Sequence, residues 1–114
     1  MSDQCLFCRI VAGEIPADVV REDRDTLAFR DVDPKAPVHV LVVPKVHHPD
    51  AAAVLAAAGG LLASIFATAV AVAEDEELDS GYRMVFNTGP DAGQSVPHAH
   101  LHLLGGRHLS WPPG

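Results

Sequence analysis

Apolar residues occur in short groups along the chain, and their spacing predicts several strands. Residues 18–22 and 26–31 are two such groups around a polar turn, which indicates a hairpin. Residues 38–43 form a β-branched apolar run typical of a buried central strand. Residues 82–87 and 96–104 predict two further strands, because each begins and ends at turn-forming residues.

The middle of the chain predicts helices. Residues 51–73 carry no charge, and eleven of these 23 residues are Ala. The stretch is long enough to span a bilayer, but acidic residues rather than basic anchors flank it. We therefore expect a soluble protein with a short helix after Pro49-Asp50, a division at Gly59-Gly60, and a longer helix from 61 to about 78. Residues 5–12 predict another short helix.

Strands outnumber helices in this order, and the two main helices come together in the middle. The order predicts an α+β fold, in which a short and a long helix pack on one face of an antiparallel sheet of about five strands. The chain of 114 residues is long enough to bury its own core, so we treat residues 1–114 as one domain.

The charge balance and the cysteine content exclude several classes of protein. Lys and Arg total 8 against 15 Asp and Glu, which gives a net charge of −7. A protein that binds nucleic-acid phosphates would need the opposite balance. The first four residues show neither the basic start nor the apolar run of a signal peptide, and two cysteines are too few for a disulfide scaffold. We expect a cytoplasmic protein that binds neither nucleic acid nor membrane.

Histidine alternates with apolar residues in the last predicted strand. Side chains two positions apart on a strand share a face, so His98, His100 and His102 would lie together while the residues between them face the core. Neighbouring imidazoles disfavour one another's protonation, which makes the cluster costly as structure alone. The spacing by itself leaves catalysis, metal binding and solvated surface histidines open.

A glycine-rich loop, residues 89–95, directly precedes these histidines and ends in Gln94-Ser95. Backbone N–H groups in such loops approach anions closely, as they do in phosphate-binding loops. A glycine-rich loop alone is more often a simple turn. Joined to a strand with three histidines, it indicates chemistry at phosphorus.

The sequence Gly93-Gln94-Ser95-Val96 followed by His98-x-His100-x-His102 resembles the signature of the histidine-triad superfamily. Gly105-Gly106-Arg107 and the ending Trp111-Pro112-Pro113-Gly114 resemble its Hint branch, the nucleoside phosphoramidases. Further matches cover most of the chain: Phe7, Ile10, Glu14-Ile15-Pro16, residues 27–31 and residues 39–45.

The resemblance implies hydrolysis of the P–N bond in purine nucleoside 5′-phosphoramidates. His100 would attack the α-phosphorus and form a covalent nucleotidyl-imidazole, which water then hydrolyses. A partly neutral imidazole is a suitable nucleophile at pH 7. Ser95 would help to protonate the leaving amine, and no metal is needed for the chemistry. The other implied catalytic residues are His39, His98 and His102.

The resemblance also implies a nucleotide site. Asp31 would accept hydrogen bonds from the ribose, Asn87 would lie near the phosphate, and Gln94 with the backbone amides of Gly93 and Ser95 would bind phosphate oxygens. An apolar purine slot and the tail complete the site: Phe7, Ile10, Ile15, Phe29 and Trp111. From the residues alone, core packing is the default explanation of the four slot residues, and turns could explain Asp31 and Asn87. His39 interrupts an apolar strand and is either a hydrogen-bonded core residue or a functional one.

Other functions remain open at this point. A related branch cleaves the P–O bonds of dinucleoside polyphosphates, although the Trp-Pro-Pro-Gly ending argues against that branch. The uridylyltransferase branch has Gln at the third triad position, where this chain has His102. The protein could also be a nucleotide-binding interaction module whose catalysis is incidental.

Cys5 and Cys8 have the spacing of half a tetrahedral zinc site, although such a pair can also be redox-active or merely structural. Bacterial proteins that resemble this chain complete the site with two histidines, which correspond here to His47 and His98. His48 stands beside His47 and would point elsewhere. The resemblance thus implies a structural zinc with four protein ligands.

The predicted long helix is apolar on almost every face between residues 61 and 73, whereas a surface helix normally has a polar face. One sheet covers only one side of such a helix. We therefore expect a homodimer with an isologous interface, and the resemblance implies that each tail lies near the partner's active site.

Overall fold

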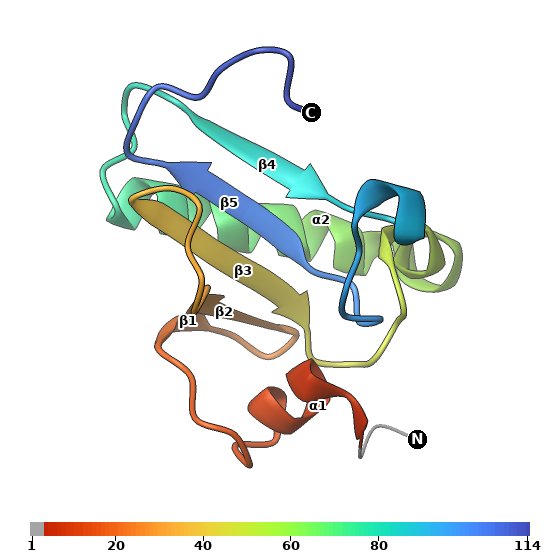
Figure 1. Cartoon of the computed structure of the whole chain (residues 1–114). Coiled ribbons are helices and arrows are strands. Elements are labelled where there is room, and N and C mark those ends of the chain that lie inside the picture. The colour runs from red at the N-terminus through yellow and green to blue at the C-terminus, as the bar shows by residue number, and fades with distance from the viewer. Residues whose placement is uncertain (1–3) are drawn as a thin grey trace.

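Five antiparallel strands form the centre of the molecule in the order β1-β2-β3-β5-β4 (Figure 1). The strands are β1 (Val19–Glu22), β2 (Thr26–Arg30), β3 (Val38–Pro44), β4 (Tyr82–Phe86) and β5 (Leu101–Gly105). This computed structural model describes residues 4–114; residues 1–3, which belong to the segment without signal-peptide features, lie outside it. The predicted α+β class and the five-stranded antiparallel sheet are confirmed.

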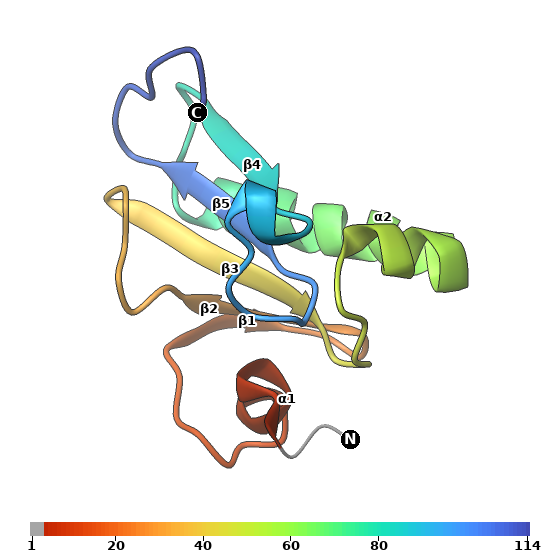
Figure 2. The same ribbon diagram turned by 45° about the vertical axis from the view of Figure 1, so that its right-hand side comes forward.

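Helices lie on both faces of the sheet (Figures 1 and 2). The long helix α2 (Ala51–Asp75) packs against Val40 and Val42 of β3, whereas α1 (Leu6–Val11) packs against Leu41 and Val43 of the same strand. Alternate residues of β3 thus face opposite layers, as the period of a strand requires. The two predicted main helices do pack on one face of the sheet, and α1 covers part of the opposite face.

The two predicted main helices are two segments of one kinked helix. Asp50 caps its start, because its side chain accepts a hydrogen bond from the Ala53 N–H at 2.9 Å. The backbone leaves the helical region at Ala58 (φ −160°, ψ 75°), one residue before the predicted division at Gly59-Gly60. The helix ends at Asp75, three residues short of the predicted end.

The last strand begins later than predicted, at Leu101 instead of residue 96. Pro97 has no N–H to donate, and the Ala99 N–H donates to the His48 carbonyl at 2.7 Å rather than to a neighbouring strand. The predicted alternation nevertheless persists through this irregular segment. Ala99, Leu101 and Leu103 are all buried in the core beneath α2, so the histidines point to the opposite side.

The helix α2 is long and apolar enough to cross a membrane by length and composition alone. Here Ile65, Ala69 and Val72 pack against the sheet and are buried. Other apolar side chains of the same helix are exposed, Leu55 to 63% and Phe66 to 40%. This chain therefore covers only one side of α2.

Candidate active site

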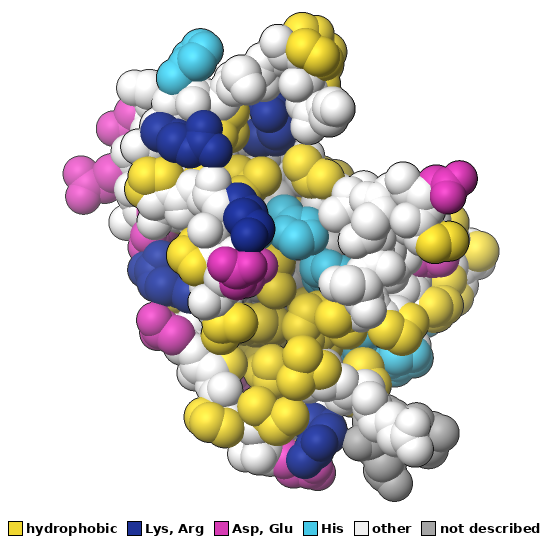
Figure 3. Space-filling view, in the orientation of Figure 1, with side chains coloured by type: hydrophobic (Ala, Val, Ile, Leu, Met, Phe, Trp, Pro, Cys, Tyr) yellow, Lys and Arg dark blue, Asp and Glu magenta, His cyan; other side chains and the backbone are white. Residues whose placement is uncertain are grey.

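A cavity of about 310 Å³ opens between α1, β2, β3 and the end of the glycine-rich loop. Four of the residues lining it are polar and were predicted as site residues: Asp31, Ser95, His100 and His102. The predicted purine slot also lines it: Phe7, Ile10, Ile15 and Phe29. Figure 3 shows histidine side chains in the middle of this face, next to a broad group of hydrophobic ones. A larger hollow of about 600 Å³, near Tyr82 and Arg107, contains none of the predicted residues.

His100 presents an unprotonated nitrogen to this cavity. Its Nδ1 lies 2.8 Å from the His98 carbonyl oxygen, which can only accept a hydrogen bond. Nδ1 therefore carries the proton of the neutral ring, and Nε2 keeps its lone pair. Burial lowers the pKa of His100, although the bond to the carbonyl opposes this effect. The ring is thus kept neutral and nucleophilic.

His39 fixes the proton of His102 on Nε2, whereas the proton of His100 is on Nδ1. The Lys35 N–H donates to His39 Nδ1 at 3.0 Å, so the proton of His39 sits on Nε2. His39 Nε2 lies 2.9 Å from His102 Nδ1 and donates to it, while Asp31 Oδ2 lies 3.4 Å from the same Nε2. The remaining nitrogen of His102, Nε2, therefore carries the proton.

Burial keeps this pair neutral. It lowers the pKa of His102 to about 4, and the neighbouring His100 and His39 add to the effect. Burial also lowers the pKa of His39, against the attraction of Asp31. Within residues 4–114, one buried side-chain nitrogen or oxygen atom has no hydrogen-bond partner, and it is His102 Nε2.

The site thus places a lone pair and an unpartnered donor on adjacent rings, whose centroids lie 4.9 Å apart. A buried donor without a partner is rare in folded proteins, and a bound water or ligand normally satisfies it. A group with an electrophilic centre and a charged oxygen satisfies both, because His100 Nε2 can attack the centre while His102 Nε2 donates to the oxygen. A phosphoryl group has this form.

The glycine-rich loop uses most of its own hydrogen-bonding groups. The Gln94 side chain accepts from the Gly89 N–H at 2.9 Å and donates to the carbonyls of Pro49 and Val96 at 2.7 and 3.0 Å. The Gly93 N–H bonds to the Pro90 carbonyl at 3.0 Å, in a left-handed conformation (φ 82°) that favours glycine. Gln94 and Gly93 therefore brace the loop, and Ser95 is the predicted loop residue that reaches the cavity.

Of the remaining predicted nucleotide-binding residues, one lines the cavity and two do not. Asp31 lines the cavity and also accepts the Asp33 N–H at 2.8 Å, so it is both a turn acceptor and a site residue. Asn87 follows β4 and does not line the cavity. Trp111 is 80% exposed and does not line the cavity either.

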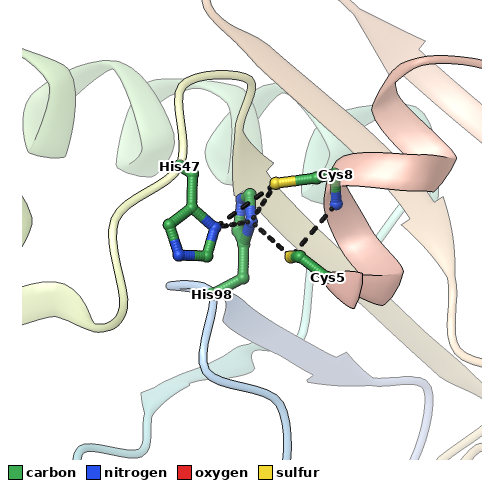
Figure 4. Close-up of side chains that lie close together, drawn as sticks. All are labelled: Cys5, Cys8, His47 and His98. Carbon is green, nitrogen blue, oxygen red and sulfur yellow. Dashed lines mark hydrogen bonds between the residues drawn. The ribbon is translucent and has the colours of Figure 1, made fainter. Parts of the chain in front are cut away.

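Beside the triad, the four predicted metal ligands converge (Figure 4). His98 Nδ1 lies 3.3 Å from Cys5 Sγ, 3.4 Å from Cys8 Sγ and 3.1 Å from His47 Nδ1. Cys8 Sγ lies 3.3 Å from His47 Nδ1. The neighbouring His48 instead contributes its backbone carbonyl to the Ala99 N–H.

The chemistry of these donors fits a metal such as zinc. Zn–S bonds of about 2.3 Å and Zn–N bonds of about 2.0–2.1 Å place the ligand atoms of a tetrahedral site about 3.3–3.8 Å apart, close to the separations here. His98 Nε2 donates to the Pro44 carbonyl at 2.9 Å, which directs the lone pair of Nδ1 toward the two sulfurs. Burial lowers the pKa of His98 to about 4, so the ring is neutral, as a ligand must be.

Backbone groups complete both sites, and the sequence pattern did not reveal them. The Lys35 N–H and the Pro44 and His98 carbonyls decide which nitrogen of each histidine carries the proton. Every residue has such groups, so residue types carry no signal for them.

Comparisons with known proteins agree with this geometry. The sequence profile of the HIT domain matches residues 12–109. A HIT family hydrolase from Legionella pneumophila has a similar structure, with a TM-score of 0.93 and 52% identity over 96% of this chain and 99% of that chain. The 14 kDa zinc-binding protein of Zea mays is 48% identical over 96% of this chain and 87% of its own length. Adenylylsulfatase HINT1 of Arabidopsis thaliana is 46% identical over 96% and 76%, respectively.

Proposed function

This chain belongs to the HIT domain family of nucleotide-binding hydrolases, and we propose that it cleaves the P–N bond of purine nucleoside 5′-phosphoramidates. The observation that carries the proposal is the pair of adjacent nitrogens: the lone pair of His100 Nε2 and the unpartnered donor at His102 Nε2. Asp31 and the apolar wall of the cavity would hold the ribose and the purine.

The reaction would proceed in two displacements at phosphorus. His100 Nε2 forms a bond to the α-phosphorus while the P–N bond breaks, and the leaving amine takes a proton from the Ser95 hydroxyl. Water then attacks the phosphorus, its proton returns to Ser95, and His100 leaves with its lone pair. The N–H of His102 would stabilise the charge that develops on the phosphoryl oxygen in both steps.

The first experiment compares His100→Asn with the wild type on an adenosine 5′-phosphoramidate. The variant should lose nearly all turnover but still bind AMP. His108→Asn, which changes an exposed histidine outside the cavity, is the matched control and should turn over normally. A His100→Asn enzyme that retains more than a small fraction of the wild-type kcat would reject the nucleophile.

The name of the Arabidopsis relative favours a second substrate, adenylyl sulfate. Sulfate leaves without a proton, whereas an amine needs one. Ser95→Ala should therefore slow phosphoramidate cleavage much more than adenylyl sulfate cleavage. Rates of the wild type on the phosphoramidate, on adenylyl sulfate and on diadenosine polyphosphates, measured side by side, would decide the preference. A preference for adenylyl sulfate or for diadenosine polyphosphates would overturn the proposed P–N specificity.

We also propose that Cys5, Cys8, His47 and His98 hold a structural zinc ion. The ligand separations and the zinc-binding relative support this assignment. Four protein ligands leave no position for water, so the ion would hold the fold together and take no part in the chemistry. Elemental analysis after zinc-supplemented expression should give close to one equivalent per chain, and well under half an equivalent would reject the site.

The uncovered side of α2 supports a homodimer. Phe66 of α2 packs edge-on against Phe86 of β4 with centroids 5.8 Å apart, which joins the apolar side of the helix to the edge strand of the sheet. A second copy of the chain would cover both elements around a two-fold axis. A second copy would bury the exposed apolar side of α2, which then would not have to insert into a membrane. We therefore propose a cytoplasmic location.

A further inference from the structure

The helix α1 connects the metal ligands with the wall of the cavity. Cys5 caps the helix and Cys8 lies in its first turn, so Phe7 lies between the two cysteines in the sequence. Phe7 is buried, with 4% of its surface exposed, and together with Leu6 and Ile10 it lines the cavity. The same six-residue helix thus contributes to two sites.

Phe7 packs edge-on against three rings that belong to other elements. Its centroid lies 5.0 Å from that of His100, 5.9 Å from that of His98 and 5.6 Å from that of Phe29. Such edge contacts are directional, so the position of Phe7 affects the orientation of the His100 ring. A shift of α1 would change both the shape of the cavity and the support of the nucleophile.

A helix of six residues is too short to be stable by itself. Among the other side chains of α1, Leu6 is 44% exposed and Arg9 pairs with the nearby Glu14 at 3.5 Å on the surface, while Ile10 and Val11 are only partly buried against the core. The buried attachments of α1 and its cap are Phe7 and Cys5, and Cys5 and Cys8 lie beside His98 and His47. Thiol–imidazole contacts are weak, whereas thiolate–metal bonds are strong, so an ion at this cluster would lock α1 in place.

We propose that metal binding at the Cys5–Cys8–His47–His98 cluster and purine nucleotide binding in the cavity are coupled through Phe7. The inference rests on the proposed function insofar as a nucleotide occupies the cavity. Coupling between two sites is reciprocal, so the metal should raise nucleotide affinity and the nucleotide should raise metal affinity by the same factor. The expected factor is about tenfold, within the usual range of such couplings.

The experiment follows zinc release from the loaded protein into excess chelator, with and without saturating AMP. Most affinity differences between related complexes lie in the dissociation rate, so we expect AMP to slow zinc release by about tenfold in the wild type. Phe7→Leu keeps all four ligands and should remove most of this effect. Arg9→Ala alters an exposed side chain of the same helix and should preserve it. Because release starts from the folded, loaded protein, the readout does not require a folded metal-free state.

Calorimetry of AMP binding and hydrogen exchange complete the test. Chelator-treated protein should bind AMP about tenfold more weakly, and its α1 amides should lose protection while those of β3 keep it. AMP that binds the loaded protein but leaves zinc release unchanged overturns the coupling and spares the proposed function. A loaded protein that binds no AMP overturns the proposed function itself, and a protein that never takes up zinc overturns the metal part of the proposal.

Discussion

His39 contacts His102, the neighbour of the predicted nucleophile, and its replacement should slow catalysis strongly. His39→Phe keeps a planar ring of similar size in a position where only 4% of the side chain is exposed. The change removes two hydrogen bonds, one from the Lys35 N–H at 3.0 Å and one to His102 Nδ1 at 2.9 Å. His102 then loses the partner that fixes both its ring orientation and the proton on Nε2.

The magnitude follows from these two bonds. A buried group left without its partner costs about 1–3 kcal/mol, and the Lys35 N–H lies near the surface, so we expect a loss of about 2–4 kcal/mol in the free energy of unfolding. Removal of one preorganised donor to a transition state costs about 10²–10³ in kcat in other enzymes. The donor of His102 is loosened here rather than removed, so kcat should fall by about 10–100-fold.

Urea unfolding and steady-state kinetics on an adenosine 5′-phosphoramidate measure the two effects. His39→Gln supplies an amide N–H near the position of His39 Nε2 and should recover part of kcat. His108→Phe makes the same replacement at an exposed histidine and should leave kcat unchanged. A folded His39→Phe enzyme whose kcat stays within about twofold of the wild type would refute the reasoning, because the orientation of His102 would then not matter.

Three further predictions concern stability and assembly. Burial lowers the pKa of His102 from 6.5 to about 4, so the unfolded chain binds more protons between these values. The stability that neutral His102 contributes is complete above about pH 6.5 and is lost as the pH falls toward 4. In urea unfolding, His102→Asn should therefore flatten the dependence of the unfolding free energy on pH in this range, and an unchanged slope would contradict the prediction. Gln94→Ala removes three hydrogen bonds that brace the glycine-rich loop and should lower the free energy of unfolding by about 1–3 kcal/mol, whereas an unchanged value would show that the loop holds without them. Phe66→Lys should convert a dimer into a 12.1 kDa species in sedimentation at micromolar concentration, and a wild type that already sediments at that mass would remove the basis for a dimer.

The hydrophobic pattern predicted the strands well where it also determined the packing. Alternation along residues 99–103 correctly predicts which side chains enter the core beneath α2. It does not predict where strand pairing begins, because pairing depends on backbone groups: Pro97 lacks an N–H, and the Ala99 N–H bonds elsewhere. Similarly, Gly59-Gly60 marks a weak point in the long helix, but the break itself occurs at Ala58, since glycine lowers helix propensity without determining where the chain bends.

The late start of β5 also has a chemical consequence that residue spacing cannot show. On a regular strand the His98 carbonyl would point along the sheet toward a neighbouring strand, and the three histidines would be equivalent. Because pairing begins only at Leu101, this carbonyl accepts the His100 Nδ1–H instead, which leaves the lone pair on Nε2. The Pro44 carbonyl and His39 set the protons of His98 and His102 in the same way. Three histidines of identical spacing thus differ in which nitrogen carries the proton, because three different neighbours fix their protons, and this difference supports the three roles that we propose for them: metal ligand, nucleophile and donor.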